Sequence, residues 1–130
     1  MTAILRRITT ALFLFLLSVG SFADDHMTEA TPVGAVYWLA VNDPESFVTS
    51  LEKYWTSETG QANPGYAIVR EVLSAGESDA THSVAVVYPS YDAWDESNAL
   101  NLKSEAAAAF QREVQKSVEV RRTGMFEFTG

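Results

Sequence analysis

The chain contains no cysteine, and only two histidines and four prolines, in 130 residues. Without cysteine it can form neither a disulfide nor a lipoprotein anchor, so its fold must be stabilised by the hydrophobic core alone. Basic residues are also few, since 9 Lys and Arg stand against 17 Asp and Glu, for a formal net charge of -8. This balance makes nucleic acid and anionic membrane surfaces poor partners. No nucleotide-binding loop, nucleophile elbow, zinc-ligand spacing or carboxylate pair rises above background.

The N-terminal stretch has the order of a secretory signal peptide. Two arginines precede an apolar run over residues 11–17, and small residues at Ser21 and Ala23 fit the positions that a signal peptidase reads. We therefore expect residues 1–23 to be cleaved and the mature protein to be periplasmic or secreted, with no membrane attachment. An uncleaved membrane anchor is the alternative, although the apolar run is shorter than the roughly 20 residues that a spanning helix needs. A cytosolic protein would leave the basic-then-apolar order unexplained.

Behind the cleavage site, residues 24–32 are polar and end in a proline, which predicts a flexible tail before a single domain over residues 33–130. The mature chain would begin Asp24-Asp25-His26. A free amine, two amides and a third-position imidazole make a square plane of four nitrogens that suits Cu(II) or Ni(II). His26, with Asp24 and Asp25, is therefore the candidate metal site, and a solvated tail is the simpler interpretation. No other cofactor is expected.

Hydrophobic periodicity predicts six elements in the order strand, helix, strand, strand, helix, strand. The stretch 33–42 is apolar on both alternating faces, as in a strand buried on both sides. Asp43 caps a helix that begins at Pro44 and carries an apolar stripe as far as Trp55. The later elements are a loop at 58–65, strands at 66–73 and 81–88, a helical region from Tyr91, and a strand at 118–128. We expect the asparagines at 98–101 to interrupt the helical region, which has Leu102 on its apolar face.

This order is the split βαβ arrangement of the ferredoxin-like fold, an α+β class with a four-stranded antiparallel sheet and two helices on one face. In that topology the strands lie in the spatial order fourth, first, third, second, so the stretch 33–42 is central. Two helices cover only one face of the sheet, and the other face still carries apolar residues. We therefore expect a homodimer that stacks two sheets into a dimeric α/β barrel.

The second helical region contains Tyr91-Asp-Ala-Trp94, followed by Ser104-Glu-Ala-Ala-Ala-Ala-Phe-Gln-Arg-Glu-Val114. It resembles dimeric α/β-barrel proteins of the antibiotic-biosynthesis-monooxygenase type, in which an aromatic-rich helix start precedes a small-residue turn and a Phe-Gln pair. The resemblance implies a superfamily of cofactor-free quinol oxygenases, haem-degrading enzymes and members without known activity. Haem-degrading members use an Asn on the first strand, a Trp on the third strand and a His on the second helix. The third strand here has no Trp and the second helix no His, so haem degradation is not expected.

Several aromatic side chains are candidates for a ligand pocket. Trp38, Tyr88 and Trp94, with Trp55, could line a site for a small hydrophobic or aromatic molecule, although aromatic core packing explains the same residues. Binding such a molecule is the leading functional hypothesis. A structural or partner-binding dimer with a filled interior is an alternative.

The main alternative to ligand binding is a cofactor-independent monooxygenase or isomerase, in which His82, Tyr88 or Arg122 would supply the polar group. A solvent-exposed turn residue is the simpler interpretation of His82. Arg122 could hold an anionic ligand, but cross-strand pairing is the simpler expectation for the arginines. The residues concerned are Arg70, Arg121 and Arg122, with Glu71, Glu119 and Glu127 as partners.

Overall fold

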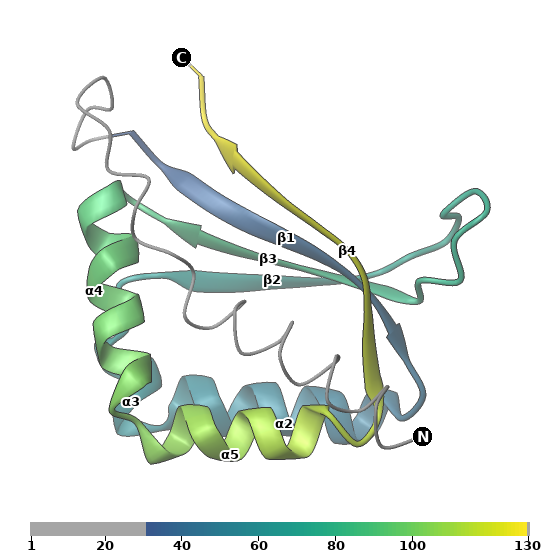
Figure 1. The fold of residues 1–130 in the computed structure, drawn as a ribbon, viewed down its shortest axis with the longest axis horizontal. Coiled ribbons are helices and arrows are strands. Elements are labelled where there is room, and N and C mark those ends of the chain that lie inside the picture. Colours follow the sequence, from purple (N-terminus) through teal and green to yellow (C-terminus); the bar gives the residue numbers. More distant parts are fainter. Residues whose placement is uncertain (1–30, 130) are drawn as a thin grey trace.

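The computed structural model describes residues 31–129, which form one four-stranded antiparallel sheet with helices on one side of it (Figure 1). The expected signal peptide, nearly all of the tail and the His26 site lie outside the described residues. The strands lie in the order β2-β3-β1-β4. Both the α+β ferredoxin-like class and the interior position of the first strand are therefore confirmed. The strands are β1 (Val33–Val41), β2 (Tyr66–Glu71), β3 (His82–Tyr88) and β4 (Val118–Glu127), and the helices are α2 (Pro44–Thr56), α3 (Glu58–Ala62), α4 (Tyr91–Leu102) and α5 (Glu105–Val114).

The hydrophobic core lies between the helices and one face of the sheet. Alternate residues of β1 from Val33 to Val41 point into it, and Phe47 of α2 and Phe110 of α5 pack against them. On the opposite face of β1, Val36 and Trp38 are only half-buried. No helix within residues 31–129 is long and apolar enough to cross a lipid bilayer.

The start of α2 follows the predicted capping chemistry. The Asp43 carboxylate accepts hydrogen bonds from the backbone N–H of Ser46 at 3.2 Å and from its hydroxyl at 2.9 Å. These bonds hold the pKa of Asp43 below its ordinary value, because they stabilise the charged form. Leu51 and Tyr54 on the predicted stripe are buried, and α2 lies beside α5 (Figure 1).

The loop predicted at 58–65 is wrong in its first half, because residues Glu58–Ala62 form the short helix α3. Ser57 caps this helix by accepting a hydrogen bond from Gly60 N–H at 3.1 Å. A Cβ atom on Gly60 would lie 2.1 Å from the carbonyl oxygen of Tyr54. The glycine that suggested a loop is therefore what lets α3 pack closely against α2.

The predicted interruption at 98–101 is also wrong. Asn98 and Asn101 are buried inside a continuous α4. The helical region is interrupted only after Leu102, and Ser104 caps the next helix, α5, by accepting a hydrogen bond from Ala107 N–H at 3.1 Å. Leu102 was expected in the core but is 65% exposed, because it is the last residue before this break.

A β-bulge in β4 shifts the predicted alternation of that strand. Trp38 pairs with Arg122 and Leu39 pairs with Val120, which leaves Arg121 as the extra residue. Val120 therefore packs against the core on the helix side, whereas Phe126, which pairs with Gly34, lies on the opposite face. Without the bulge, strict alternation along a strand at 118–128 would place Val120 and Phe126 on one face.

Candidate functional site

Two adjoining hollows lie between α2 and the helix-facing side of the sheet. The inner one is a cavity of about 20 Å³. The outer one is an open, mainly apolar groove of about 420 Å³, a size within the range of small-molecule sites. Leu51, Trp55 and Ala67 line both hollows. The inner cavity is completed by Tyr54, Asn63, Val84, Val86, Tyr88, Asn101 and Phe110, and the groove by Val48, Glu52, Thr56, Tyr66 and Val69.

Five buried polar side chains are connected at the inner cavity. The Tyr54 hydroxyl donates to Asn101 Oδ1. Asn63 Nδ2 donates to the Tyr54 hydroxyl at 2.9 Å and to Ser97 Oγ at 2.9 Å. Ser97 Oγ in turn donates to the Tyr88 hydroxyl at 3.3 Å. An otherwise apolar pocket thus has a polar inner end, the arrangement that orients a ligand in many small-molecule sites.

The five members of this network come from four parts of the fold. Tyr54 belongs to the buried stripe of α2, and Asn63 is the C-cap of α3. Tyr88 ends β3, while Ser97 and Asn101 lie one turn apart on the buried side of α4. Closing the helices over the sheet is what brings them together.

The two tyrosines of the network keep their protons at neutral pH. Burial raises the pKa of Tyr54, and burial raises the pKa of Tyr88 to about 12. Amides and hydroxyls complete the polar lining of the inner cavity, so it supplies hydrogen bonds rather than a group that exchanges a proton near pH 7.

His82 lies away from both hollows. It is 7% exposed, its ring stands edge-on to Phe47 with centroids 6.1 Å apart, and Nδ1 lies 2.8 Å from Thr81 Oγ1. The interpretation as a solvent-exposed turn residue is therefore wrong. His82 pairs with Leu39 in the sheet. Because Leu39 points into the core, the His82 side chain lies on the same, helix-facing side of the sheet.

The candidate aromatic residues fall on two sides of the sheet. Tyr88 and Trp55 line the inner cavity, and Trp94 stacks on Tyr88 from α4. Trp38 lies on the opposite face, paired with Ser83 and Arg122 in the neighbouring strands. Trp38 and Arg122 therefore line neither hollow.

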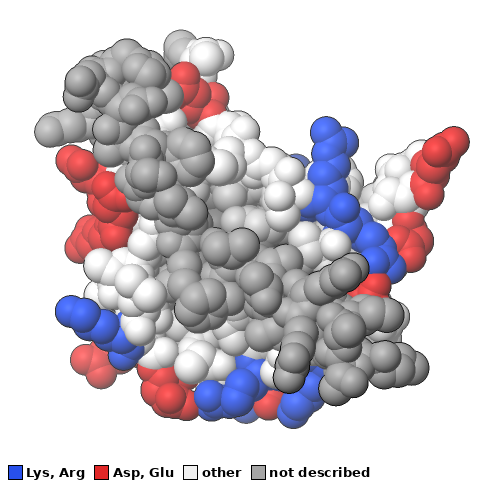
Figure 2. Space-filling view, viewed as in Figure 1, with Lys and Arg blue, Asp and Glu red and all other residues white. Residues whose placement is uncertain are grey.

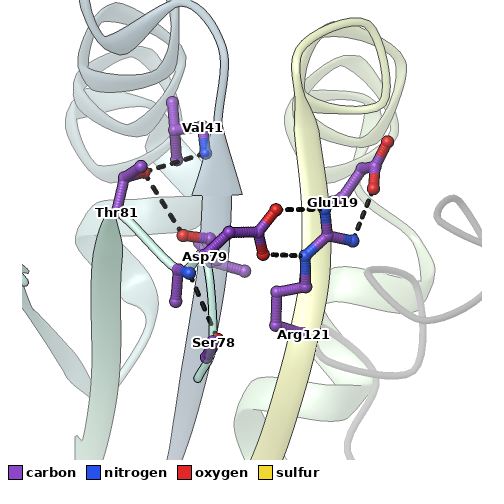
Figure 3. Close-up of polar contacts among 8 residues, drawn as sticks. Val41, Ser78, Asp79, Thr81, Glu119 and Arg121 are labelled. Carbon is purple, nitrogen blue, oxygen red and sulfur yellow. Dashed lines mark hydrogen bonds and ion pairs between the residues drawn. The ribbon is translucent and has the colours of Figure 1, made fainter. Parts of the chain in front are cut away.

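The arginines do not pair as expected. Arg121 binds Asp79 through two hydrogen bonds of 2.6 and 3.0 Å and Glu119 of its own strand at 2.5 Å (Figure 3). Asp79 comes from the β2–β3 connection, which protrudes from the domain in Figure 1, and Figure 2 shows a group of basic side chains beside it. Within residues 31–129, neither Arg70 nor Arg122 forms an ion pair. The expected cross-strand pairing to Glu71 and Glu127 is therefore wrong.

Tyr54, Asn63, Ser97 and Asn101 were missed as site residues. A signal for two of them was present, because Ser97 and Asn101 continue the helical spacing that begins at Trp94 and so share its buried side. The asparagines at 98–101 were instead interpreted as an interruption of the helix, and Ser97 was not singled out. Among residues 31–129 there is no group of three or more His, Cys, Asp or Glu side chains that could hold a metal ion.

Comparison with known proteins supports the fold. No protein-family model matches the chain, and no curated protein matches it by sequence. Among solved structures, the chain is similar to SnoaB, a cofactor-independent oxygenase from Streptomyces nogalater, with a TM-score of 0.55, 15% identity, and coverage of 78% of this chain and 96% of SnoaB. A protein of unknown function from Rhodopseudomonas palustris gives a TM-score of 0.50 and 13% identity, covering 92% of this chain and 88% of that one. The chain thus shares the fold of these proteins, as the resemblance in the second helical region implied.

Proposed function

We propose that this protein binds a small hydrophobic or aromatic molecule in the groove between α2 and β2. The observation that carries the proposal is a mainly apolar groove that adjoins a cavity with a buried polar end. Trp55 and Ala67 line both hollows, so a ligand in the groove would contact the wall of the cavity directly. Burial of the ligand's apolar surface would supply most of the affinity.

Isothermal titration calorimetry with indane, a rigid hydrocarbon without polar atoms, tests this proposal. The Ala67→Leu variant should weaken binding, because the added side chain fills space that both hollows share. Ile68→Ala is the matched control, since it alters the neighbouring residue on the opposite face of β2, beside Ala85. Absence of indane binding to the unaltered protein, or equal binding by both variants, would refute the proposal.

A cofactor-independent monooxygenase is the second candidate, and the similarity to SnoaB favours it. The inner cavity could position a reactive ring through its hydroxyl and amide groups, while the substrate itself would supply the electrons that reduce dioxygen. Oxygen consumption with electron-rich hydroquinones in the metal-free protein tests this activity. Consumption equal to that of a blank without protein would exclude it for those substrates.

We further propose that the protein acts after export and as a homodimer formed through the face of the sheet that carries Trp38 and Phe126. Fusion of residues 1–25 to a reporter that is active only outside the cytoplasm tests export, and a silent reporter would refute it. Sedimentation of the mature protein should give a dimer. A monomer at micromolar concentration would contradict the proposed assembly.

A further inference from the structure

One row of side chains crosses all four strands on the face of the sheet that is turned away from the helices. Trp38 of β1 lies between its pairing partners, Ser83 of β3 and Arg122 of β4. Arg70 of β2 pairs with Ser83 and completes the row. Residues directly opposite each other in an antiparallel sheet share a face, and Trp38 is on the face away from the core. The order across the sheet is therefore Arg70, Ser83, Trp38, Arg122, which we call the arginine row.

The two arginines of this row lack a negatively charged partner in an acidic chain, whose formal net charge is -8. Arg70 and Arg122 are both exposed, and neither forms a hydrogen bond or an ion pair within residues 31–129. Arg121, by contrast, is bound to Asp79 and Glu119. The arginine row thus offers two guanidinium groups that can donate hydrogen bonds to an anion.

The two residues between the arginines suit the remainder of a ligand. Trp38 is half-buried, so part of its indole ring is open to another flat ring. Ser83 is only 4% exposed, and its hydroxyl forms no hydrogen bond within the part of the chain that the structure describes. A buried hydroxyl without a partner is unfavourable, and the oxygen of a ligand carboxylate could accept its hydrogen.

The separation of the arginines favours a ligand with two negative charges. Three strand-to-strand intervals lie between β2 and β4, which corresponds to about 14 Å between the Cα atoms of Arg70 and Arg122. A single carboxylate could contact both guanidinium groups only if both side chains folded inward over Trp38. A ring with carboxylates at opposite ends could accept from each arginine at its own end of the row, in the paired geometry that guanidinium and carboxylate groups adopt.

We propose that the arginine row binds a rigid aromatic dicarboxylate, with the ring on Trp38, one carboxylate at Arg122, and the other at Arg70 and Ser83. This site lies on the opposite face of the sheet from the groove and the inner cavity, so it is separate from the ligand site proposed there. In the proposed dimer a partner subunit would cover this face. The dianion would then neutralise arginines that would otherwise be enclosed without a counter-charge.

Calorimetric titration with terephthalate and phthalate tests the inference, because the two isomers have the same atoms and charge and differ only in the placement of the carboxylates. The unaltered protein should bind terephthalate, with carboxylates at opposite ends, more tightly than phthalate. Arg70→Gln and Arg122→Gln should each weaken terephthalate binding by roughly 3- to 10-fold, the usual worth of one hydrogen-bonded contact. Arg112→Gln is the matched control, since it removes the same charge from α5 on the other side of the sheet.

Tryptophan fluorescence gives an independent measurement of where the ring lies. Terephthalate should quench the fluorescence of the unaltered protein and of Trp55→Phe, whose altered residue lines the groove, but not that of Trp38→Phe. The inference fails if terephthalate does not bind, if phthalate binds as tightly, if Arg112→Gln weakens binding as much as the two row variants, or if quenching survives in Trp38→Phe. None of these results would bear on the groove, which is tested separately with indane.

Discussion

Tyr88 of β3 and Trp94 of α4 stack with their ring centroids 5.7 Å apart and their planes 6° from parallel. The stack joins the sheet to α4, and Ser97, one turn further along the same helix, donates to the Tyr88 hydroxyl. One pair of rings therefore connects the packing of the core to the polar end of the inner cavity.

Trp94→Ala should lower the free energy of unfolding by about 3–5 kcal/mol, the usual cost of removing a buried tryptophan from a core. Urea denaturation followed by circular dichroism measures the change. Trp38→Ala serves as the control, because Trp38 is only half-buried and lies on the opposite face of the sheet. If Trp94→Ala and Trp38→Ala lowered the free energy of unfolding equally, the Tyr88–Trp94 stack would not be a main contributor to the stability of the core.

The stability of the protein should fall between pH 10 and pH 12. The pKa of Tyr88 rises from 10.0 to about 12 in the folded state, so its contribution is complete below pH 10 and is lost as pH rises through the folded value. Ionisation of Tyr88 should lower the free energy of unfolding by at most about 3 kcal/mol, because each unit of pKa difference between the folded and unfolded states corresponds to about 1.4 kcal/mol. Urea denaturation across this range should show a shallower decline for Tyr88→Phe than for the unaltered protein. The same slope in both would show that another group causes the decline.

Asn63→Ala should destabilise the protein by about 1–3 kcal/mol, because it removes a buried amide and leaves its partners without a hydrogen bond. The amide oxygen also accepts from the backbone N–H of Gly65 at 2.9 Å, which fixes the start of β2. Thermal unfolding measures the effect. The control is Gln61→Ala in the same short helix, whose side chain is exposed and should cost much less. A loss no larger than that of the control would show that the network contributes little to stability.

Arg121→Gln should destabilise the protein more than Arg122→Gln at neutral pH and low salt. Arg121 bonds to Asp79 and Glu119, whereas Arg122 has no ion pair within residues 31–129. The Arg121 guanidinium lowers the pKa of Asp79 from 3.8, so the stabilisation is present above pH 3.8 and is lost as pH falls through the lower, folded value. Salt should also reduce it, since the pair is exposed.

Urea denaturation at neutral pH, in acid and in added salt measures the difference between these neighbouring variants. If the difference in free energy of unfolding between Arg121→Gln and Arg122→Gln were the same in acid and in high salt, Arg121 would act through packing at the bulge rather than through charge.

Much of the fold could be predicted because its signals are local. The apolar run in 33–41, the Asp43-Pro44 helix start and the short polar link between β2 and β3 each depend on neighbouring residues. The errors at α3 and in α4 arise because packing between elements overrides local preference. Gly60 and the asparagines at 98–101 locally favour a loop, but Gly60 packs closely against α2 and Asn98 and Asn101 are buried in α4.

The candidate site could be predicted only in part. Aromatic residues were expected to form a pocket, but their distribution between the two faces of the sheet depends on strand register, which separates Trp38 from Tyr88. Asn63 and Ser97 are 34 residues apart and meet only when α3 and α4 fold over the same end of the sheet.

The sequence by itself determined the order of the elements, the capping of the first helix and the interior place of β1, because periodicity and capping act over a few residues. Only the tertiary structure decided that Asn63, Ser97 and Tyr88 share a buried hydrogen-bonded chain, and that His82 is buried apart from it. Polar residues are tolerated in a core only when partners from elsewhere in the chain satisfy them, and no local pattern reveals those partners.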